Sequence, residues 1–103
     1  MSGERISVEI DSLLEELIPG YLTGIRNNIA SIRESLLSGD FDSIKILGHN
    51  MKGSGGGYGF HDITEHGGEI ERGAREKLPD VISSAVDRLE DYVNRVDVKF
   101  VDV

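Results

Sequence analysis

The chain has 103 residues, enough for one domain with a modest core and too few for two. It contains no cysteine, which excludes a disulfide framework and a thiolate metal site and favours a reducing, cytoplasmic setting. With 19 acidic and 11 basic residues, the net charge of −8 opposes binding to nucleic acid or anionic membranes. No apolar run approaches a membrane span, and the first residues lack the apolar core of a signal peptide.

The first strong pattern is helical and lies between residues 14 and 36. Ser12 and Glu15 have capping-box spacing and can begin this helix. Pro19 removes one backbone donor, but the apolar stripe keeps its phase across it, which predicts a kinked helix. Gly39 is expected to end it. The stripe itself recurs at steps of three and four residues, as in Leu14, Ile18, Leu22, Ile25, Ile29, Ile32 and Leu36.

Three further amphipathic helices are predicted after residue 39. Asp40 can cap the second helix, which begins at Phe41 and is expected to break at Gly59. A third helix follows, and Leu78-Pro79-Asp80 separates it from the fourth. The buried face of the third helix is predicted to carry Phe60, Ile63, Gly67, Ile70 and Ala74, and that of the fourth Ile82, Ala85, Val86, Leu89, Val93 and Val96.

These patterns predict an all-α protein, an antiparallel up-down four-helix bundle over residues 10–96. Residues 1–9 are expected to be disordered or extended, and residues 97–103 to form an extended or frayed tail. The alternative fold is a three-helix bundle with a detached amino-terminal helix. The short chain favours a free-standing module that works as a monomer.

The stretch from Gly48 to Gly59 is the most informative part of the sequence. On a helix turning ~100° per residue, His49 points away from the apolar side and is predicted to face water. Gly53 lies one turn later on the same exposed stripe, flanked by Lys45 and Lys52.

This arrangement suits phosphoryl transfer between proteins. A neutral imidazole, with a reference pKa of ~6.5, is a nucleophile near neutral pH. It must be exposed to meet partner proteins, and a rigid helix aligns it for in-line transfer. Lys52 can offset the new negative charge on His49, and Gly53 removes a side chain where a partner must come close.

The cluster of glycines carries a penalty. Each glycine in a helix interior costs ~1 kcal/mol relative to alanine. Either the second helix ends near Ser54, or close backbone approach requires small residues there. Gly53 fits partner access, whereas the run Gly55 to Gly57 can instead allow the second and third helices to pack tightly; the sequence leaves both interpretations open.

The string His49-x-x-Lys52-Gly53-Ser54, followed by Gly59 and another amphipathic helix, resembles the signature of histidine-containing phosphotransfer (HPt) domains. The resemblance implies a four-helix bundle in a two-component phosphorelay. It implies that His49 accepts a phosphoryl group from a receiver-domain aspartate, at the ring nitrogen farther from the backbone, and donates it to another receiver. Lys52 would stabilise charge, and Gly53 would leave room for the partner.

The resemblance also implies what the domain lacks and which proteins it meets. It implies no kinase activity, no bound nucleotide and no cofactor of its own, the Mg²⁺ needed for transfer being held by the receiver. The partners would be receiver domains of response regulators or hybrid histidine kinases. Lys45, Asn50 and Ser54 are candidate partner-binding residues, and an apolar docking patch is expected from exposed members of the set Tyr21, Ile25 and Ile44.

Competing functions are weaker. His61 and His66 are five residues apart, on different helix faces, which disfavours a metal site. The glycines do not match the phosphate-binding fingerprints of nucleotide-binding loops, and no nucleophile–base pair for hydrolysis stands out. The main alternative is a receiver-binding module that sequesters or scaffolds its partner without productive relay.

Overall fold

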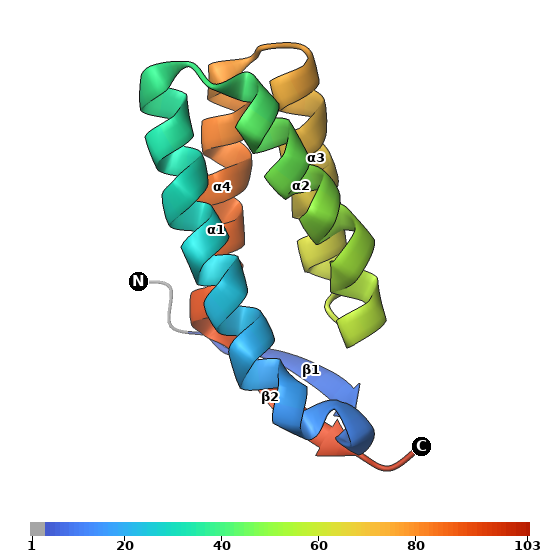
Figure 1. Ribbon diagram of the computed structural model, residues 1–103. Helices are drawn as coiled ribbons and strands as arrows, with labels where there is room; N and C mark the ends of the chain where they lie inside the picture. Colours follow the sequence, from blue (N-terminus) through green and yellow to red (C-terminus); the bar gives the residue numbers. More distant parts are fainter. Residues whose placement is uncertain (1–3) are drawn as a thin grey trace.

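The computed structural model describes residues 4–103. The chain is mostly helical, as predicted, with helices α1 (Ile18–Ser38), α2 (Phe41–Gly55), α3 (His61–Arg75) and α4 (Pro79–Arg95). Figure 1 shows the α1–α2 and α3–α4 connections at one end of the bundle and the α2–α3 connection at the other. Shorter elements complete the fold: strands β1 (Ile6–Asp11) and β2 (Val96–Val101), and 3-10 segments η1 (Ser12–Leu17) and η2 (Gly56–Tyr58).

Most helix boundaries lie where capping signals predict them. The side chain of Asp40 accepts a hydrogen bond from the backbone N–H of Ser43 at 3.1 Å and caps α2. Gly39 and Gly59 have φ of 71° and 94°, a left-handed conformation that glycine adopts without a steric penalty. Pro79 stands in the first turn of α4, where its missing N–H costs little. The predicted boundaries at Gly39, Asp40 and Pro79 are confirmed, whereas α2 already ends at Gly55 and the 3-10 turn η2 continues the chain to the left-handed Gly59.

The predicted start of the first helix is wrong. Residues 12–17 form the 3-10 segment η1, and α1 begins only at Ile18. Pro19 therefore lies in the first turn of α1, where a proline is tolerated, and it does not kink a helix interior. The cap is also different, because the Asp11 side chain accepts from the Leu13 N–H at 2.9 Å, while Ser12 donates to Asp102 at 2.6 Å.

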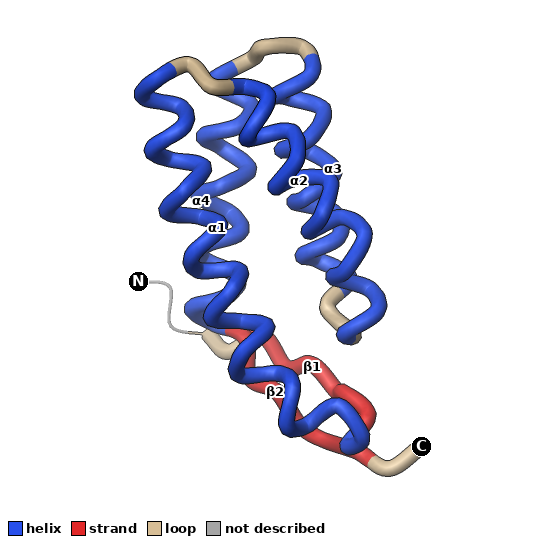
Figure 2. Tube along the Cα trace, viewed as in Figure 1, coloured by secondary structure: helices blue, strands red, loops and turns tan. Residues whose placement is uncertain are grey.

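A strand pair makes the all-α prediction incomplete. β1 and β2 form a parallel ladder from Ile6↔Val96 to Asp11↔Val101, drawn in red in Figure 2. Most of the predicted terminal segments thus belongs to this ladder, while the first three residues of segment 1–9 lie outside the described residues. The ladder joins the two ends of the described chain, because β1 precedes the four helices in the sequence and β2 follows them.

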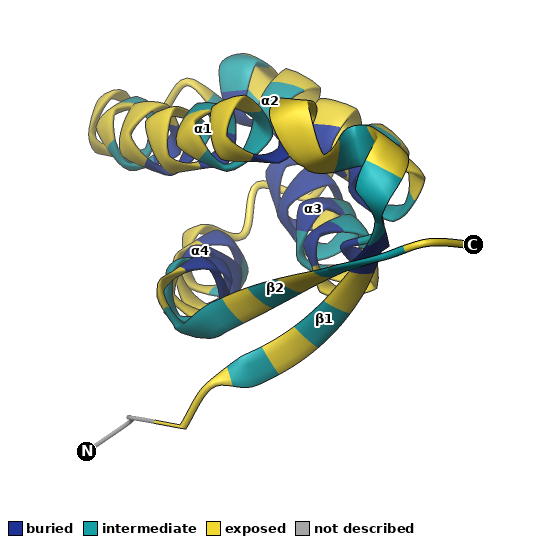
Figure 3. Ribbon diagram, turned by 90° about the horizontal axis from the view of Figure 1, so that it is seen from below, coloured by how far each residue is buried: buried dark blue, intermediate teal, exposed yellow. Residues whose placement is uncertain are grey.

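The core lies between the four helices and is rich in isoleucine (Figure 3). Helix α1 packs against both α2 and α4, so the alternative of a detached amino-terminal helix is wrong. The α1–α4 contact is braced at its solvent side by Arg33, which pairs with Asp87 at 2.8 Å and Glu90 at 3.0 Å. The strand pair closes one end of this core, where Ile10 is buried.

Candidate functional site: an exposed histidine held by a buried carboxylate

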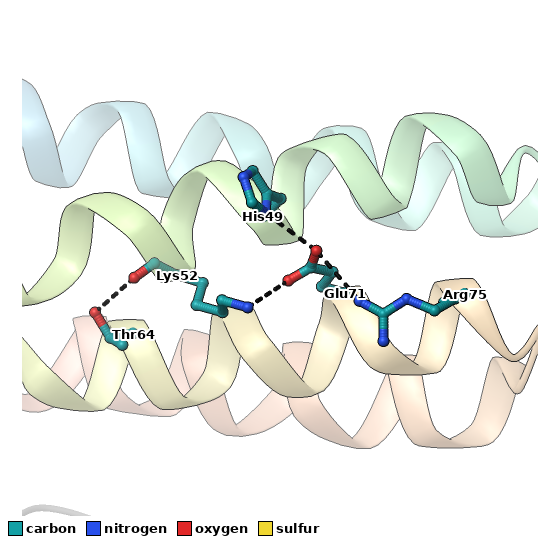
Figure 4. A network of polar contacts seen from close by, with 5 residues as sticks. All are labelled: His49, Lys52, Thr64, Glu71 and Arg75. Atoms are coloured by element: carbon teal, nitrogen blue, oxygen red, sulfur yellow. Dashed lines mark hydrogen bonds and ion pairs between the residues drawn. The ribbon is translucent and has the colours of Figure 1, made fainter.

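His49 stands on the solvent side of α2. Its side chain is 65% exposed, while its neighbour Gly48 and nearby Met51 are buried. The prediction that this imidazole faces water from the middle of a helix is confirmed. Figure 4 shows the ring above the junction of α2 and α3.

The ring is held by Glu71, a residue of α3 that the sequence pattern did not identify. His49 Nδ1 lies 3.0 Å from Glu71 Oε2. The Glu71 side chain is only 11% exposed and is the one buried charged side chain among the described residues. A buried carboxylate is costly unless charged and hydrogen-bonding groups surround it, so its surroundings decide its state.

Two cations complete the surroundings of Glu71. Lys52 Nζ lies 3.1 Å from Oε1, and an Arg75 guanidinium nitrogen lies 3.3 Å from Oε2 (Figure 4). The hydrogen bond from Lys52, supported by that from His49, holds the pKa of Glu71 below its ordinary value against the opposing effect of burial. Glu71 is therefore ionised at neutral pH.

The ionised carboxylate determines which nitrogen of His49 carries the proton. A carboxylate only accepts hydrogen bonds, so Nδ1 must be the donor to Glu71. In the neutral ring the lone pair then lies on Nε2. No described residue forms a hydrogen bond with Nε2, and the ring remains accessible. The geometry presents one defined nucleophilic nitrogen to solvent.

Glycines at the α2–α3 crossing bring Glu71 close to His49. A Cβ on Gly48 would lie 2.7 Å from the Glu71 backbone N and 2.9 Å from the Gly67 O. A Cβ on Gly67 would lie 2.6 Å from the Lys52 backbone N. Real Cβ atoms do not approach backbone this closely, so the two helices touch through bare backbone directly beneath the His49 network.

The later glycines divide between the two interpretations. A Cβ on Gly55 would lie 2.6 Å from the Thr64 backbone N, so Gly55 is required for helix packing. Thr64 reinforces this contact, accepting from the Gly56 N–H at 2.8 Å and donating to the Lys52 carbonyl at 3.0 Å. A Cβ on Gly53 or Gly57 would meet nothing within 4 Å, so these two glycines face open space.

The other candidate site residues differ in their surroundings. The side chains of Lys45 and Asn50 are exposed and form no hydrogen bond or ion pair with the described part of the chain. Ser54 instead shares a 2.8 Å hydrogen bond with the hydroxyl of Tyr21, whose ring stacks on Tyr58 at a centroid distance of 4.1 Å. Ser54 thus links α1 to α2.

Two of the three residues considered for an apolar docking patch belong to the core, which competed with the patch for all three. Ile25 and Ile44 are 2% and 0% exposed and belong to the core, while Tyr21 is partly buried. The exposed apolar residue near the histidine is Ile46, which is 59% exposed and lies one turn before His49.

The remaining histidines do not join this site. His61 is exposed, and His66 Nδ1 lies 3.4 Å from Glu69 of its own helix. Over residues 4–103, no three or more histidine, aspartate or glutamate side chains gather as metal ligands would. The missed residue Glu71 did carry a signal, because it sits next to Ile70 on the side of the third helix predicted to be buried.

Comparisons with protein-family models, with curated proteins and with solved structures gave no match. Within residues 4–103, no helix is both long enough and apolar enough to cross a membrane. The function is therefore inferred from the site itself.

Proposed function

We propose that this chain is a phosphoryl carrier of the HPt type in a His-Asp phosphorelay. His49 would accept a phosphoryl group from an aspartyl phosphate of one receiver domain and donate it to an aspartate of another. The observation that carries the proposal is the exposed imidazole whose Nδ1 is fixed by a buried carboxylate, with Nε2 left open.

The transfer step follows from this tautomer. The Nε2 lone pair of His49 attacks the phosphorus of the aspartyl phosphate, an N–P bond forms, and the P–O bond to the aspartate breaks. The aspartate leaves as a carboxylate, and no proton has to be removed from Nε2. The phosphorylated ring keeps its proton on Nδ1 and gains positive charge, which the Glu71 carboxylate at 3.0 Å stabilises. The reverse step discharges the phosphoryl group to the next receiver.

Lys52 and Arg75 then have a double effect on the charge of the site. Both contact Glu71, so they hold its carboxylate in place and outweigh its negative charge. Two cations against one carboxylate leave the surroundings of His49 locally positive in a chain with a net charge of −8. A dianionic phosphoryl group is thereby favoured on this face.

The surroundings of His49 leave room for a partner. The chain path in Figure 1 is compatible with the antiparallel up-down bundle of HPt domains. Gly53, with open space around it, would let a receiver loop approach, and Ile46 would supply an apolar contact. In this role the chain works in the cytoplasm without kinase activity, nucleotide or metal of its own, and the receiver brings the Mg²⁺.

The direct test is incubation with a phosphorylated receiver domain. The expected result is a label on the chain that is lost in acid and kept in alkali, as a phosphoramidate is. His49→Gln should abolish labelling, whereas His61→Gln, another exposed histidine, should leave it unchanged. An acid-stable label, or a label that persists in His49→Gln, would contradict the proposal.

A second function is binding a receiver without relay. It is favoured by side chains around His49 that are exposed and have no partner within the described chain. The side chains of Lys45 and Asn50 make no hydrogen bond or ion pair within the described chain, and Ile46 is exposed. In that case receiver binding measured by calorimetry would be retained in His49→Gln, and the wild-type chain would acquire no label. If the wild-type chain is labelled, and His49→Gln loses the label but still binds the receiver, the result supports the relay function.

A further inference from the structure

The strand pair β1–β2 has free edges. In Figure 3, β1 is the outer strand, and β2 lies between it and helix α4. A two-stranded sheet leaves a row of unpaired backbone groups along each outer edge, which is a template for another strand. Over residues 4–103 the sheet contains only these two strands.

A hollow of about 400 Å³ lies beside β1 and is lined by four consecutive residues of the strand. No β2 residue lines it, and its other wall comes from the start of α3 and from α4. Its lining residues are Ile6, Ser7, Val8, Glu9, Gly59, His61, Asp62 and Tyr92.

The edge sequence is self-complementary in charge. Arg5 and Glu9 are exposed and stand symmetrically about Ser7, two residues on either side of it. If a second copy of β1 ran antiparallel along the edge with Ser7 opposite Ser7, each Arg5 would face Glu9 of the partner subunit. Opposite charges placed directly across an antiparallel ladder stabilise the pairing.

We infer that two copies of this chain form a symmetric dimer by antiparallel pairing of their β1 edges, centred on Ser7. The interface is isologous, as a two-fold axis requires, and it contains two equivalent Arg5–Glu9 pairs. The result is a four-stranded sheet in which both β1 strands are central and both β2 strands are outer. This inference does not depend on the function proposed for His49, and it replaces the monomer expected from the sequence.

The register follows from the faces of the strand. Ile6, Val8 and Ile10 are more buried than Ser7 and Glu9, so they form the inner face. A shift of one residue would place inner residues opposite outer ones, which disfavours it. A shift of two residues, centred on Val8, would place Glu9 opposite Ser7 and Arg5 opposite Asp11. The Asp11 carboxylate already accepts the Leu13 N–H at 2.9 Å, so this register has the weaker charge pairing.

Arg5 and Glu9 remain available for this contact. Arg5 makes a single long hydrogen bond of 3.4 Å to the Asn94 carbonyl. Glu9 lies opposite Lys99 in the β1–β2 ladder but forms no ion pair with any described residue. A short strand edge buries little area, so the dimer is expected to be weak and visible only at high protein concentration.

Sedimentation equilibrium over a wide concentration range tests the dimer. The wild-type chain should associate reversibly to a dimer, whereas Arg5→Glu and Glu9→Arg should each be monomeric, because like charges then face each other. Mixing the two variants, or combining both changes in one chain, should restore the dimer. Lys45→Glu and Glu16→Arg make the same charge changes at exposed positions outside β1 and should dimerise like the wild type.

The same measurements can also contradict the inference. A wild-type chain that stays monomeric at every concentration overturns it and leaves the edge to a strand from a different protein. Single variants that dimerise like the wild type, or a mixture that stays monomeric, overturn the proposed register. Circular dichroism of each variant establishes that the bundle itself is folded.

Discussion

The contact between α2 and α3 differs in kind from that between α1 and α4. In the first, glycines bring bare backbones together, and a buried carboxylate with three polar partners lies directly above them. In the second, branched aliphatic side chains such as Ile29 and Leu89 fill the core, and the charged groups of Arg33 and Asp87 lie at its exposed border.

Glycine content alone does not explain this difference. Helix α1 also contains two glycines, Gly20 in its first turn and Gly24 in its second, yet a Cβ at either position would meet nothing within 4 Å. On α2, a Cβ on Gly48 would have two backbone atoms within 3 Å. A glycine that costs helix stability is compensated where it allows a close contact, and the contact that Gly48 and Gly67 allow lies beneath the candidate site.

The largest expected effect comes from adding one methyl group to a glycine of α2 and, for comparison, to a glycine of α1. Gly48→Ala should lower the free energy of unfolding by about 2 kcal/mol, because overpacking against backbone exceeds the ~1 kcal/mol gain in helix propensity. Gly24→Ala should instead raise it by up to about 1 kcal/mol, because its Cβ has room. Urea denaturation followed by circular dichroism measures both. Equal effects of the two changes would contradict the distinction between the contacts.

The next effect concerns the carboxylate above the glycines. Glu71→Ala should slow phosphoryl transfer by roughly 10- to 100-fold, since a hydrogen bond to a charged group contributes about 1.5–3 kcal/mol. Glu71→Gln should fall between the wild type and Glu71→Ala, because the amide oxygen still accepts from Nδ1 but lacks the charge. The nitrogen NMR shifts of His49 report the tautomer directly and should change in Glu71→Ala.

The matched control for Glu71 lies at the other contact. Glu90 also pairs with an arginine across two helices, and Glu90→Ala should leave both the transfer rate and the His49 shifts unchanged. If Glu71→Ala behaves like Glu90→Ala, Glu71 does not position the imidazole.

The sequence predicted what depends on local spacing. Helical periodicity, the Asp40 cap and the break at Gly59 are properties of neighbouring residues, and they also place His49 on the exposed side of its helix. The partner of His49 was missed because the contact with Glu71 joins residues 22 apart and depends on how two helices cross. A charged residue beside a predicted apolar stripe was the one local sign of it.

The strands and the start of α1 were missed for related reasons. β1 and β2 are six residues each, with the whole bundle between them, so short alternation gave no sign of pairing. The apolar stripe runs in phase through Pro19 although the backbone changes there from a 3-10 to an α conformation. Periodicity detects a buried face, but it does not separate two helical forms that share that face.

A smaller effect is expected from the charge beside His49. Lys52→Glu should slow transfer by roughly tenfold, because it replaces one cation on Glu71 with a second carboxylate. Lys45→Glu carries the same change of charge on the same helix but lies outside the Glu71 network, so its effect should be limited to weaker, salt-dependent docking. An unchanged rate in Lys52→Glu would remove Lys52 from the mechanism.

The smallest effect is the pH dependence of stability at the two contacts. Lys52 and His49 hold the pKa of Glu71 below its ordinary value in the folded chain, so the unfolded chain binds the proton more readily. The resulting stabilisation is complete above the ordinary carboxylate pKa and is lost as the pH falls through the lowered value. Glu71→Gln should therefore flatten the acid side of the stability profile, measured by urea denaturation at a series of pH values. Glu90→Gln should change that profile little, because water screens its exposed ion pair with Arg33. A profile altered equally in both variants would show that burial does not distinguish the two contacts.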